Sequence, residues 1–286
     1  MTLVSVIMSM RNSAATVAAA VRSVQLQTWP NWELIVIDDG STDRSAAIVT
    51  GFHDPRIRLV REPGSAGLAA RLNQAVGLSR GELIARMDAD DICFPERLAR
   101  QVHHLQENVA IDLLGCGAVV FSEASGLVGT LPVGLSHTDI TAQPRRGFPM
   151  PHPTWCGRAS WFRAHPYDPA LRKTQDQDLL LRTYALSRFA CLPDILLGYR
   201  QDDFDLRKVL TGRRAYAGAL WRQRAASGIA GALGGIAGQL LKGAVDGVAT
   251  GLGLTRLAQR RRLKPVPPAI VSQWAAVQRQ LSGGPA

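Results

Sequence analysis

The C-terminal part of the chain has almost no acidic side chains. Residues 206–286 contain 13 Lys and Arg residues and a single acid, Asp246, whereas residues 1–205 contain 20 basic and 22 acidic residues. The net charge of +10 therefore belongs to the C-terminal part. This asymmetry predicts a near-neutral domain at residues 1–205 that performs the binding or the chemistry, followed by a basic, Gly/Ala-rich helical region at residues 206–286.

Cysteine is also scarce, and a secretory signal is missing. The four cysteines, at positions 93, 116, 156 and 191, are far apart and form no C-x-x-C pair, which argues against a disulfide framework and a zinc cluster. The first segment, MTLVSVIMSMRN, has no basic stretch before its short apolar run, so it predicts a first β-strand. Together these absences indicate a reducing, cytoplasmic environment.

The chain also lacks the signatures of several other protein classes. The longest uncharged run of the basic region, residues 225–241, is short and glycine-rich for a membrane-spanning helix. Neither a P-loop G-K-S/T nor a G-x-S-x-G nucleophile elbow occurs. The basic region lacks the interleaved aromatic residues of single-strand binders, so nucleic acid is not an expected partner.

Short apolar runs alternate with helical patterns through the first half of the chain. Strand patterns occur at residues 3–8, 32–37, 57–60 and 82–87, and helical patterns occur at about residues 13–27, 43–50, 67–78 and 95–106. This alternation predicts βαβ units and an α/β domain with a mainly parallel sheet flanked by helices.

Acidic residues gather directly after two of these strands. Asp38 and Asp39 follow the second strand, and Asp88, Asp90 and Asp91 follow the fourth, in RMDADD. Ligands of parallel sheets bind beyond the carboxyl ends of the strands, so both clusters are expected at one edge. Crowded carboxylates repel one another, and a divalent cation, Mg²⁺ or Mn²⁺, relieves this repulsion while binding a substrate phosphate. Because Asp39 can also accept hydrogen bonds from a base or a ribose, the pattern indicates a site for a metal and a nucleoside diphosphate.

Two longer segments have a specific resemblance to a known family. VSVIMSMRN…SVQLQTWPNWELIVIDDGSTD and GLAARLNQAVGLSRGELIARMDADDICFPERL resemble the family 2 glycosyltransferases of the GT-A fold, the inverting type of bacterial polysaccharide synthesis. The resemblance is close over residues 3–105 and looser up to about residue 205. It implies a GT-A catalytic domain at residues 1–205 with the basic helical extension added after it.

The resemblance implies roles for the residues of the first strand and the first acidic cluster. Ser9 and Asp39 would line the nucleoside pocket, and Asp38 would support it. Arg71, in the helix that follows Gly67, is expected near the diphosphate. The alternatives from the residues alone are an end-of-strand serine, an Asx-turn in DDGS and a structural arginine.

The second cluster would hold the metal. By resemblance, Asp88 contacts the ribose or the metal, and Asp90 binds the metal. Asp91 either supports these ligands or caps the helix that begins near Pro95. A solvated turn with capping acids is the alternative to a metal site.

A later segment, KTQDQDLLLR, resembles the family motif that contains the general base. The resemblance implies that Asp176 takes the proton from the acceptor hydroxyl, while Asp178 orients the start of the helix. Gln175 stands where the family has Glu, which removes a negative neighbour and makes Asp176 less basic. A helix N-cap is the alternative role of Asp176.

Two further segments depart from the family or leave alternatives open. The segment GYRQDDFD keeps Tyr199 and Arg200 but has no nearby histidine for the metal, so a third protein ligand is absent or is one of the acids at positions 202 and 203. The segment PHPTW resembles the loop that faces the acceptor. We therefore expect His152 and Trp155 to contact the acceptor, with a loop-bracing imidazole and a core tryptophan as alternatives.

These expectations combine into one function with two alternatives. The protein is expected to transfer a sugar from a nucleotide diphosphate donor, a UDP-sugar, to a hydroxyl of a saccharide or lipid-linked glycan, with inversion and with Mn²⁺ or Mg²⁺. The alternatives are a non-catalytic nucleotide-sugar binder or scaffold, and a sugar-phosphate nucleotidyltransferase, whose basic glycine-rich N-terminal loop this chain lacks.

The basic region 206–286 has three possible partners on sequence grounds. It could contact an anionic membrane surface, which would place the enzyme at the inner face of the cell membrane. It could pack on the catalytic domain or on a second protomer, or it could contact nucleic acid phosphates, the least expected of the three.

Overall fold

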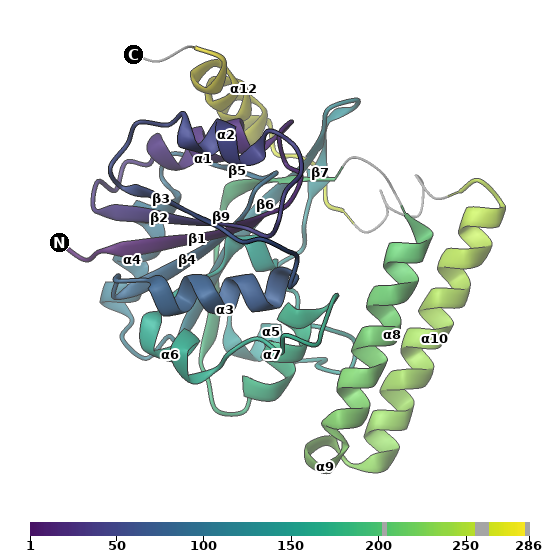
Figure 1. The fold of residues 1–286 in the computed structure, drawn as a ribbon. Coiled ribbons are helices and arrows are strands. Elements are labelled where there is room, and N and C mark those ends of the chain that lie inside the picture. Colours follow the sequence, from purple (N-terminus) through teal and green to yellow (C-terminus); the bar gives the residue numbers. More distant parts are fainter. Residues whose placement is uncertain (202–204, 255–262, 284–286) are drawn as a thin grey trace.

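A nine-stranded sheet with helices on both faces forms the body of the protein (Figure 1). The computed structural model describes residues 1–201, 205–254 and 263–283. The strand order is β3-β2-β1-β4-β8-β6-β9-β5, and β7 pairs with β6. The strands are β1 (Val4–Met10), β2 (Trp32–Asp38), β3 (Ile57–Arg61), β4 (Leu83–Asp88), β5 (Ile92–Cys93), β6 (Leu113–Ser122), β7 (Gly126–Thr130), β8 (Cys156–Arg158) and β9 (Phe189–Arg200).

The strands β1 to β4 pair with one another in parallel, as the alternating pattern predicts. Their register places Ser9 of β1 opposite Asp88 of β4, and Met10 of β1 opposite Asp38 of β2. Both acidic clusters therefore lie at the same edge of the sheet. The sequence prediction of one shared edge is confirmed.

The other half of the sheet is mixed. β8 pairs antiparallel with both β4 and β6, β9 runs parallel to β6, and β5 and β7 are antiparallel to their partners. The sequence pattern does not reveal β9 because Pro193 interrupts its apolar run. Its pairing with β6 also shifts register near Gly117.

Helices cover the two faces of the sheet and bury alternate side chains of its strands. Val6, Met8 and Val36 belong to one apolar cluster, and Ile7 and Ile35 belong to the other, as the two-residue repeat of a strand requires. One face is covered by α1 (Val17–Gln25), α2 (Ser45–Thr50) and α4 (Arg97–Glu107). The other is covered by α3 (Leu68–Leu78), α6 (Ala159–Ala164) and α7 (Gln175–Thr183). The loops also contain α5 (His137–Thr141) and the 3₁₀ turn η1 (His152–Thr154).

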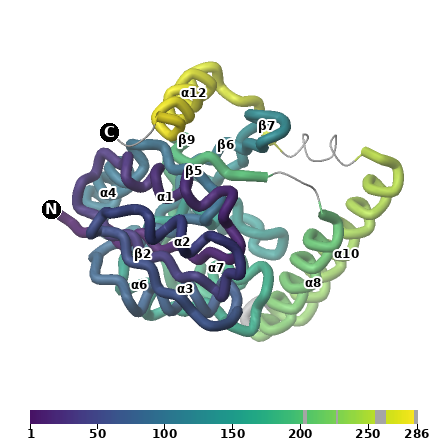
Figure 2. The backbone as a smooth tube through the Cα atoms, turned by 45° about the horizontal axis from the view of Figure 1, so that its top comes forward, coloured from purple at the N-terminus to yellow at the C-terminus, as the bar shows by residue number. Residues whose placement is uncertain are grey.

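The basic C-terminal region divides into two parts. The first is a hairpin of α8 (Leu206–Arg222), α9 (Arg224–Ser227) and α10 (Ile229–Gly251), which stands beside the sheet. The second is α12 (Pro268–Ser282), which returns to the sheet (Figure 2). Its Trp274 packs against Phe121, with ring centroids 4.6 Å apart. In the described part of the chain, no helix combines the length and the apolar character needed to cross a membrane.

Candidate functional site

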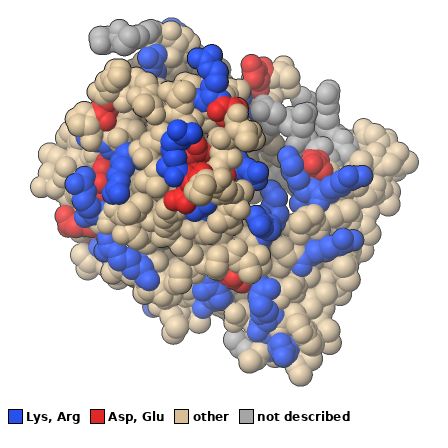
Figure 3. Space-filling view, viewed as in Figure 1, with Lys and Arg blue, Asp and Glu red and all other residues tan. Residues whose placement is uncertain are grey.

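A pocket opens where β4 ends and α7 begins. Its volume is about 550 Å³, and its lining includes Arg86 and Asp88 of β4, His152 of η1, and Asp176 and Gln177 of α7. In Figure 3, Lys and Arg side chains border the hollow between the body of the protein and the α8–α10 hairpin. The pocket thus joins a strand end, a loop and a helix start that are far apart in the sequence.

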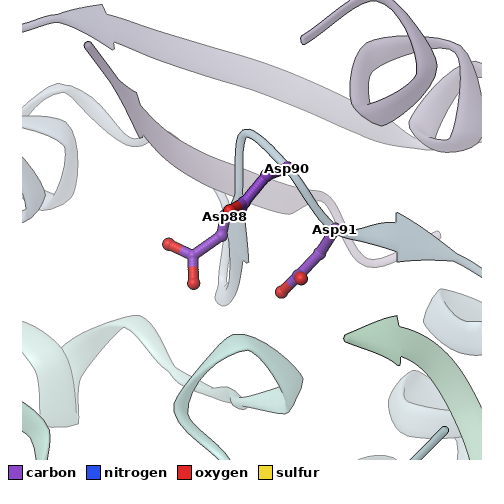
Figure 4. Close-up of side chains that lie close together, drawn as sticks. All are labelled: Asp88, Asp90 and Asp91. Atoms are coloured by element: carbon purple, nitrogen blue, oxygen red, sulfur yellow. The ribbon is translucent and has the colours of Figure 1, made fainter. Parts of the chain in front are cut away.

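The turn after β4 brings three carboxylates together. Asp88, Asp90 and Asp91 each offer one oxygen atom, and these atoms lie within 4.8 Å of one another. Figure 4 shows the three side chains at this turn. Asp90 is exposed and Asp91 is buried. The Arg200 side chain donates from Nε to the Asp90 carbonyl, at 3.0 Å, so the end of β9 supports this turn.

Arg86 neutralises one of the three acids. It lies two residues before Asp88 on the same face of β4, it is 2% exposed, and it donates two hydrogen bonds to the Asp88 carboxylate, one from Nη1 at 2.7 Å. Each carboxylate oxygen has two lone pairs, so Asp88 keeps acceptor capacity beyond this ion pair. The arginine fixes the orientation of Asp88 toward the pocket.

The other two acids are unusually easy to protonate. Partial desolvation within the turn, together with the charge of Asp88, raises the pKa of Asp90 to about 6. Burial and the charges of Asp88 and Asp90 raise the pKa of Asp91 well above its usual value. Asp91 Oδ1 accepts a hydrogen bond from the Arg200 backbone at 2.9 Å, whereas its buried Oδ2 has no hydrogen-bond partner among the described residues.

These features fit a hard divalent cation. The donor set consists of oxygens alone, as Mg²⁺ and Mn²⁺ prefer, and a cation would give the Asp91 Oδ2 atom a partner and offset the mutual repulsion. Helix capping is not the role of Asp91, because the N-cap of α4 is Glu96 and no side chain caps it.

Asp39 of the first acidic cluster joins the loop after β2 to the loop before α3 by hydrogen bonds. Asp39 is 4% exposed and accepts hydrogen bonds from Ser65 Oγ, the backbone N–H groups of Ala66 and Gly67, and Arg71 Nε, at 2.7 to 3.0 Å. Burial opposes the ionised form, but these four donors prevail and lower the pKa of Asp39. A base or ribose can bind Asp39 through its remaining lone pairs or by replacing one of these donors.

The other predicted nucleoside residues lie nearby but outside the lining of the pocket. Asp38 ends β2, and its carboxylate accepts a hydrogen bond from the Ser41 backbone, three residues on, at 2.9 Å, which stabilises the DDGS turn. Ser9 lies near the end of β1, opposite Asp88. Arg71 forms ion pairs with Asp39 and Glu62, so its guanidinium is already partnered.

Asp176 is in the first turn of α7 and lines the pocket. The N-cap of this helix is Thr174, with φ of 64°, so Asp176 is not the cap. Burial raises the pKa of Asp176, against the lowering effect of hydrogen bonds from Gln177 and the charge of Arg86. A carboxylate with a raised pKa is a stronger base, which offsets the loss of the negative neighbour at position 175.

Asp178 connects α7 to the C-terminal hairpin. It is 1% exposed and accepts hydrogen bonds from Arg182 Nε at 2.8 Å and from Arg222 Nη2 of α8 at 2.9 Å. The predicted orienting role of Asp178 thus extends beyond its own helix. It ties α7, which carries Asp176, to α8.

The two residues predicted to contact the acceptor differ in position. His152 lines the pocket, and its Nε2 atom is 2.8 Å from the Tyr167 hydroxyl. Burial and the charge of Arg86 lower the pKa of His152 well below its usual value, so the ring is neutral. Trp155 is 0% exposed and donates from its indole N–H to the Met150 carbonyl, at 3.2 Å. In this structure Trp155 packs in the core beside His152 and has no face available to a sugar.

The segment expected to offer a third metal ligand is described only in part. Gln201 lines the pocket. Positions 202 and 203 lie outside the described residues. Among the described residues, Asp91 is the third acid of the cluster.

Arg86 and Tyr167 are the site residues that the sequence interpretation missed. A signal for Arg86 exists, because a charged residue inside an otherwise apolar strand, two positions from Asp88, must find a partner on the same face. Tyr167 has no comparable signal, since its contact with His152 depends on how the loop between α6 and α7 folds back.

Comparison with known proteins assigns the family. Residues 5–163 match Glycosyl transferase family 2, which is more than half of the chain, and the chain belongs to this family. EpsE of Bacillus subtilis (strain 168) is 35% identical over 187 residues, which are 63% of this chain and 66% of EpsE. WcaA of Escherichia coli (strain K12) is 32% identical over 188 residues, 63% of this chain and 65% of WcaA.

A further relative has a descriptive name. The UDP-Glc:alpha-D-GlcNAc-diphosphoundecaprenol beta-1,3-glucosyltransferase WfgD of Escherichia coli is 39% identical over 106 residues, which are 37% of this chain and 42% of WfgD. The chain thus spans less than two thirds of the length of each of these three relatives.

Solved structures confirm the GT-A fold expected from the resemblance. Crystal structures of S. aureus TarS 1-349 align with a TM-score of 0.64 for the complex with UDP and 0.62 for the complex with UDP-GlcNAc, each at 18% identity. The UDP complex aligns over 98% of this chain and 80% of that chain, and the UDP-GlcNAc complex over 77% and 66%. At this identity the likeness concerns the fold.

Proposed function

We propose that the protein is an inverting, metal-dependent glycosyltransferase that moves a sugar from a UDP-sugar donor to a hydroxyl of a saccharide or lipid-linked glycan. The observation that carries this proposal is one pocket, in a family 2 chain, that holds both Asp88 of the acidic turn and Asp176 of α7. The name of WfgD supports a UDP-linked donor and a diphospholipid-linked acceptor, and the UDP complex of TarS supports the nucleotide.

The acidic turn is the proposed metal and diphosphate side of the site. Asp88 and Asp90 would hold Mn²⁺ or Mg²⁺, with Asp91 beside them. A cation held there would supply positive charge that favours departure of the diphosphate. Ser9, Asp38 and Asp39 would form the nucleoside side of the site, as the resemblance implies.

Asp176 is the proposed proton acceptor. The acceptor oxygen forms a bond to the anomeric carbon of the sugar, the bond from that carbon to the diphosphate breaks, and the hydroxyl proton passes to the Asp176 carboxylate. Attack from the side opposite the diphosphate inverts the configuration at the anomeric carbon. His152, which is neutral and lines the same pocket, would contact the acceptor, and Arg71 would lie on the diphosphate side.

The basic region 206–286 is proposed to attract the enzyme to anionic lipids. Its 13 basic residues and one acid favour a negatively charged surface, and the inner face of the cell membrane offers one. A lipid-linked acceptor would be located at the same surface.

The test replaces Asp176 by Asn, which keeps the size of the side chain and removes its basicity. Transfer should fall by at least about 100-fold, while metal-dependent binding of the UDP-sugar persists, measured by calorimetry. Asp168→Asn, on the loop before α7, is the control. Transfer at the wild-type rate by Asp176→Asn would reject Asp176 as the base.

A further inference from the structure

The outward side of α10 is apolar and uncovered. Seven large aliphatic residues on it are between 52% and 68% exposed: Ile229, Leu233, Leu240, Leu241, Val245, Val248 and Leu252. We name this set the outer α10 face. With 3.6 residues per turn, it lies opposite the side of α10 that buries Ala232, Gly235 and Gly243. Figures 1 and 2 both place α10 on the outside of the hairpin. A monomeric protein in water rarely leaves a contiguous apolar surface of this kind uncovered.

A stripe of basic and aromatic residues borders this face. Arg207, Arg214 and Trp221 are seven residues apart on α8, so they point to one side, and Trp221 is 44% exposed. Arg214 and Leu240 line the same groove between α8 and α10, of about 270 Å³, so the stripe adjoins the outer α10 face. The Arg224 guanidinium lies 4.7 Å from the centre of a Trp221 ring. Leu, Val, Trp and Arg in this arrangement are typical of a helix surface that binds at a lipid–water interface.

Exposed negative charge is missing from the described residues of the hairpin, 206–251. Their one acid, Asp246, is 3% exposed and accepts hydrogen bonds from Arg213 Nε, at 2.9 Å, and Nη2. The surface is therefore positive around an apolar centre. A partner that matches this surface has negative charges at its own surface and an apolar interior beneath them.

Two other occupants fit less well. The described helices are not long and apolar enough to cross a bilayer, so α10 would lie in the interface and not span it. In a two-fold dimer, the outer α10 faces of two copies would contact each other. The Arg207 and Arg214 side chains of the two copies would then approach and repel one another, because the described residues of the hairpin include no exposed acid to pair with them.

We propose that the outer α10 face docks on an anionic phospholipid bilayer. Its aliphatic side chains enter the boundary between headgroups and acyl chains, and Arg207 and Arg214 contact lipid phosphates. This docking surface rests on the proposed function for the location of the acceptor. It adds to general charge attraction a defined face of the protein and a defined orientation on the membrane.

The hairpin is fixed to the site that it would orient. Arg222 of α8 donates to Asp178 at 2.9 Å, and Gln239 of α10 donates to the Arg145 carbonyl at 3.3 Å. The Tyr216 hydroxyl donates to the Pro144 carbonyl. Asp178 is on the same helix as Asp176. Docking through α10 therefore holds the pocket at a set height and angle above the lipid.

The test is sedimentation of the full chain with vesicles of phosphatidylcholine alone or mixed equally with phosphatidylglycerol. Leu233→Gln, Leu240→Gln and Val248→Gln are combined in one variant. Val109→Gln with Leu186→Gln is the matched control, because both residues are exposed aliphatic side chains away from the hairpin, at 77% and 85%. The wild type and the control should bind the anionic vesicles, and the triple variant should bind at least about 10-fold more weakly. Part of the binding of the wild type to anionic vesicles should persist at high salt, because salt screens charges but does not remove the contacts of the aliphatic side chains.

Two results would overturn the proposal. One is equal binding of anionic vesicles by the triple variant and the control. The other is a dimer, seen by light scattering, that the triple substitution dissociates while vesicle binding stays unchanged. Metal-dependent UDP binding is measured in the same samples. UDP binding depends on the acidic turn and not on α10. If the wild type showed no metal-dependent UDP binding, that result would count against the proposed function and not against the docking surface.

Discussion

The three acids after β4 differ in what surrounds them, and this difference divides their roles. Asp88 has a buried arginine as partner, Asp91 is buried with one oxygen unpartnered among the described residues, and Asp90 is the exposed member with a pKa raised to about 6. Without a cation, ionised Asp90 costs stability, because its pKa in the folded state is above that of an unfolded Asp. That cost is absent below about pH 4 and is fully present once the pH has risen through 6.

Replacing Asp90 by Asn should therefore have opposite effects with and without metal. At pH 7 and without metal, the variant should melt roughly 2–4 °C higher than the wild type, because about 1 kcal/mol of repulsion is removed. Its affinity for Mn²⁺ should fall by at least about 10-fold, because a ligand is lost. Calorimetry and thermal melting measure the two effects. A variant that binds Mn²⁺ as the wild type does would exclude Asp90 as a ligand.

The pH dependence of metal binding follows from the same residue. Mn²⁺ competes with protons for Asp90, so affinity in the wild type should weaken as the pH falls from 7 through about 6. The Asp90→Asn variant should have a flatter profile over this range. A wild-type affinity that is constant from pH 7 to pH 5 would contradict the raised pKa.

Arg86 should influence His152 through space. Its positive charge is one cause of the lowered pKa of His152, after burial. In Arg86→Met the pKa of His152 should rise but stay below the usual value, because burial remains. Titration of the imidazole by NMR measures this shift, and His137, whose pKa burial and Arg188 lower, is the control. An unchanged His152 titration in a folded Arg86→Met protein would contradict the assigned cause.

At the scale of elements, α12 completes the core beside the acidic turn. Trp274 is 9% exposed and lies against Phe121 and Phe94, and Gly198 of β9 leaves room for its ring. A Cβ atom at position 198 would be 2.4 Å from the Trp274 ring. The helix is thus part of the catalytic body, although its residues belong to the basic C-terminal part of the sequence.

Removing the Trp274 side chain should destabilise the protein by about 3 kcal/mol, because a large apolar contact is replaced by a cavity. Trp221→Ala is the matched control, since Trp221 is 44% exposed and should cost less than about 1 kcal/mol. Urea unfolding of both variants measures the difference. Equal losses of stability would show that α12 does not pack on the body as described.

The sequence predicts some elements well and others poorly for physical reasons. β1, β2 and β4 are mainly apolar and are buried on both faces. Their alternation with helices along the chain is typical of a parallel βαβ fold. β9 is interrupted by Pro193, and β5 and β8 are too short to give a periodic signal. The helix expected at the KTQDQDLLLR motif is α7, which begins at Gln175 and ends at Thr183.

The candidate site was predictable to a similar extent. Asp88, Asp176 and His152 were expected from motifs, and one pocket joins them. The burial of Trp155 was left open by the sequence, because an indole with an N–H group suits both a core and a sugar platform. Burial depends on the fold of the loop before β8, which no local pattern reveals.

At the scale of the whole molecule, the proposed nucleotide side and the proposed base, Asp176, come from different halves of one body. The α8–α10 hairpin is attached to α7, the helix that carries Asp176. Asp88, at the end of β4, and Asp176 of α7 line one pocket. The hairpin adds a positive, apolar surface outside this pocket. In the proposed function, the acidic turn and a divalent cation together bind a nucleotide diphosphate.

The most direct test is thermal melting with UDP and a panel of UDP-sugars, in the presence and absence of Mn²⁺. The wild type should be stabilised by nucleotide only when the metal is present, because the diphosphate and the three acids share the cation. The Asp90→Asn protein should lose this joint stabilisation while remaining folded. If no nucleotide raises the melting temperature of the wild type, with or without metal, the account of the site is wrong.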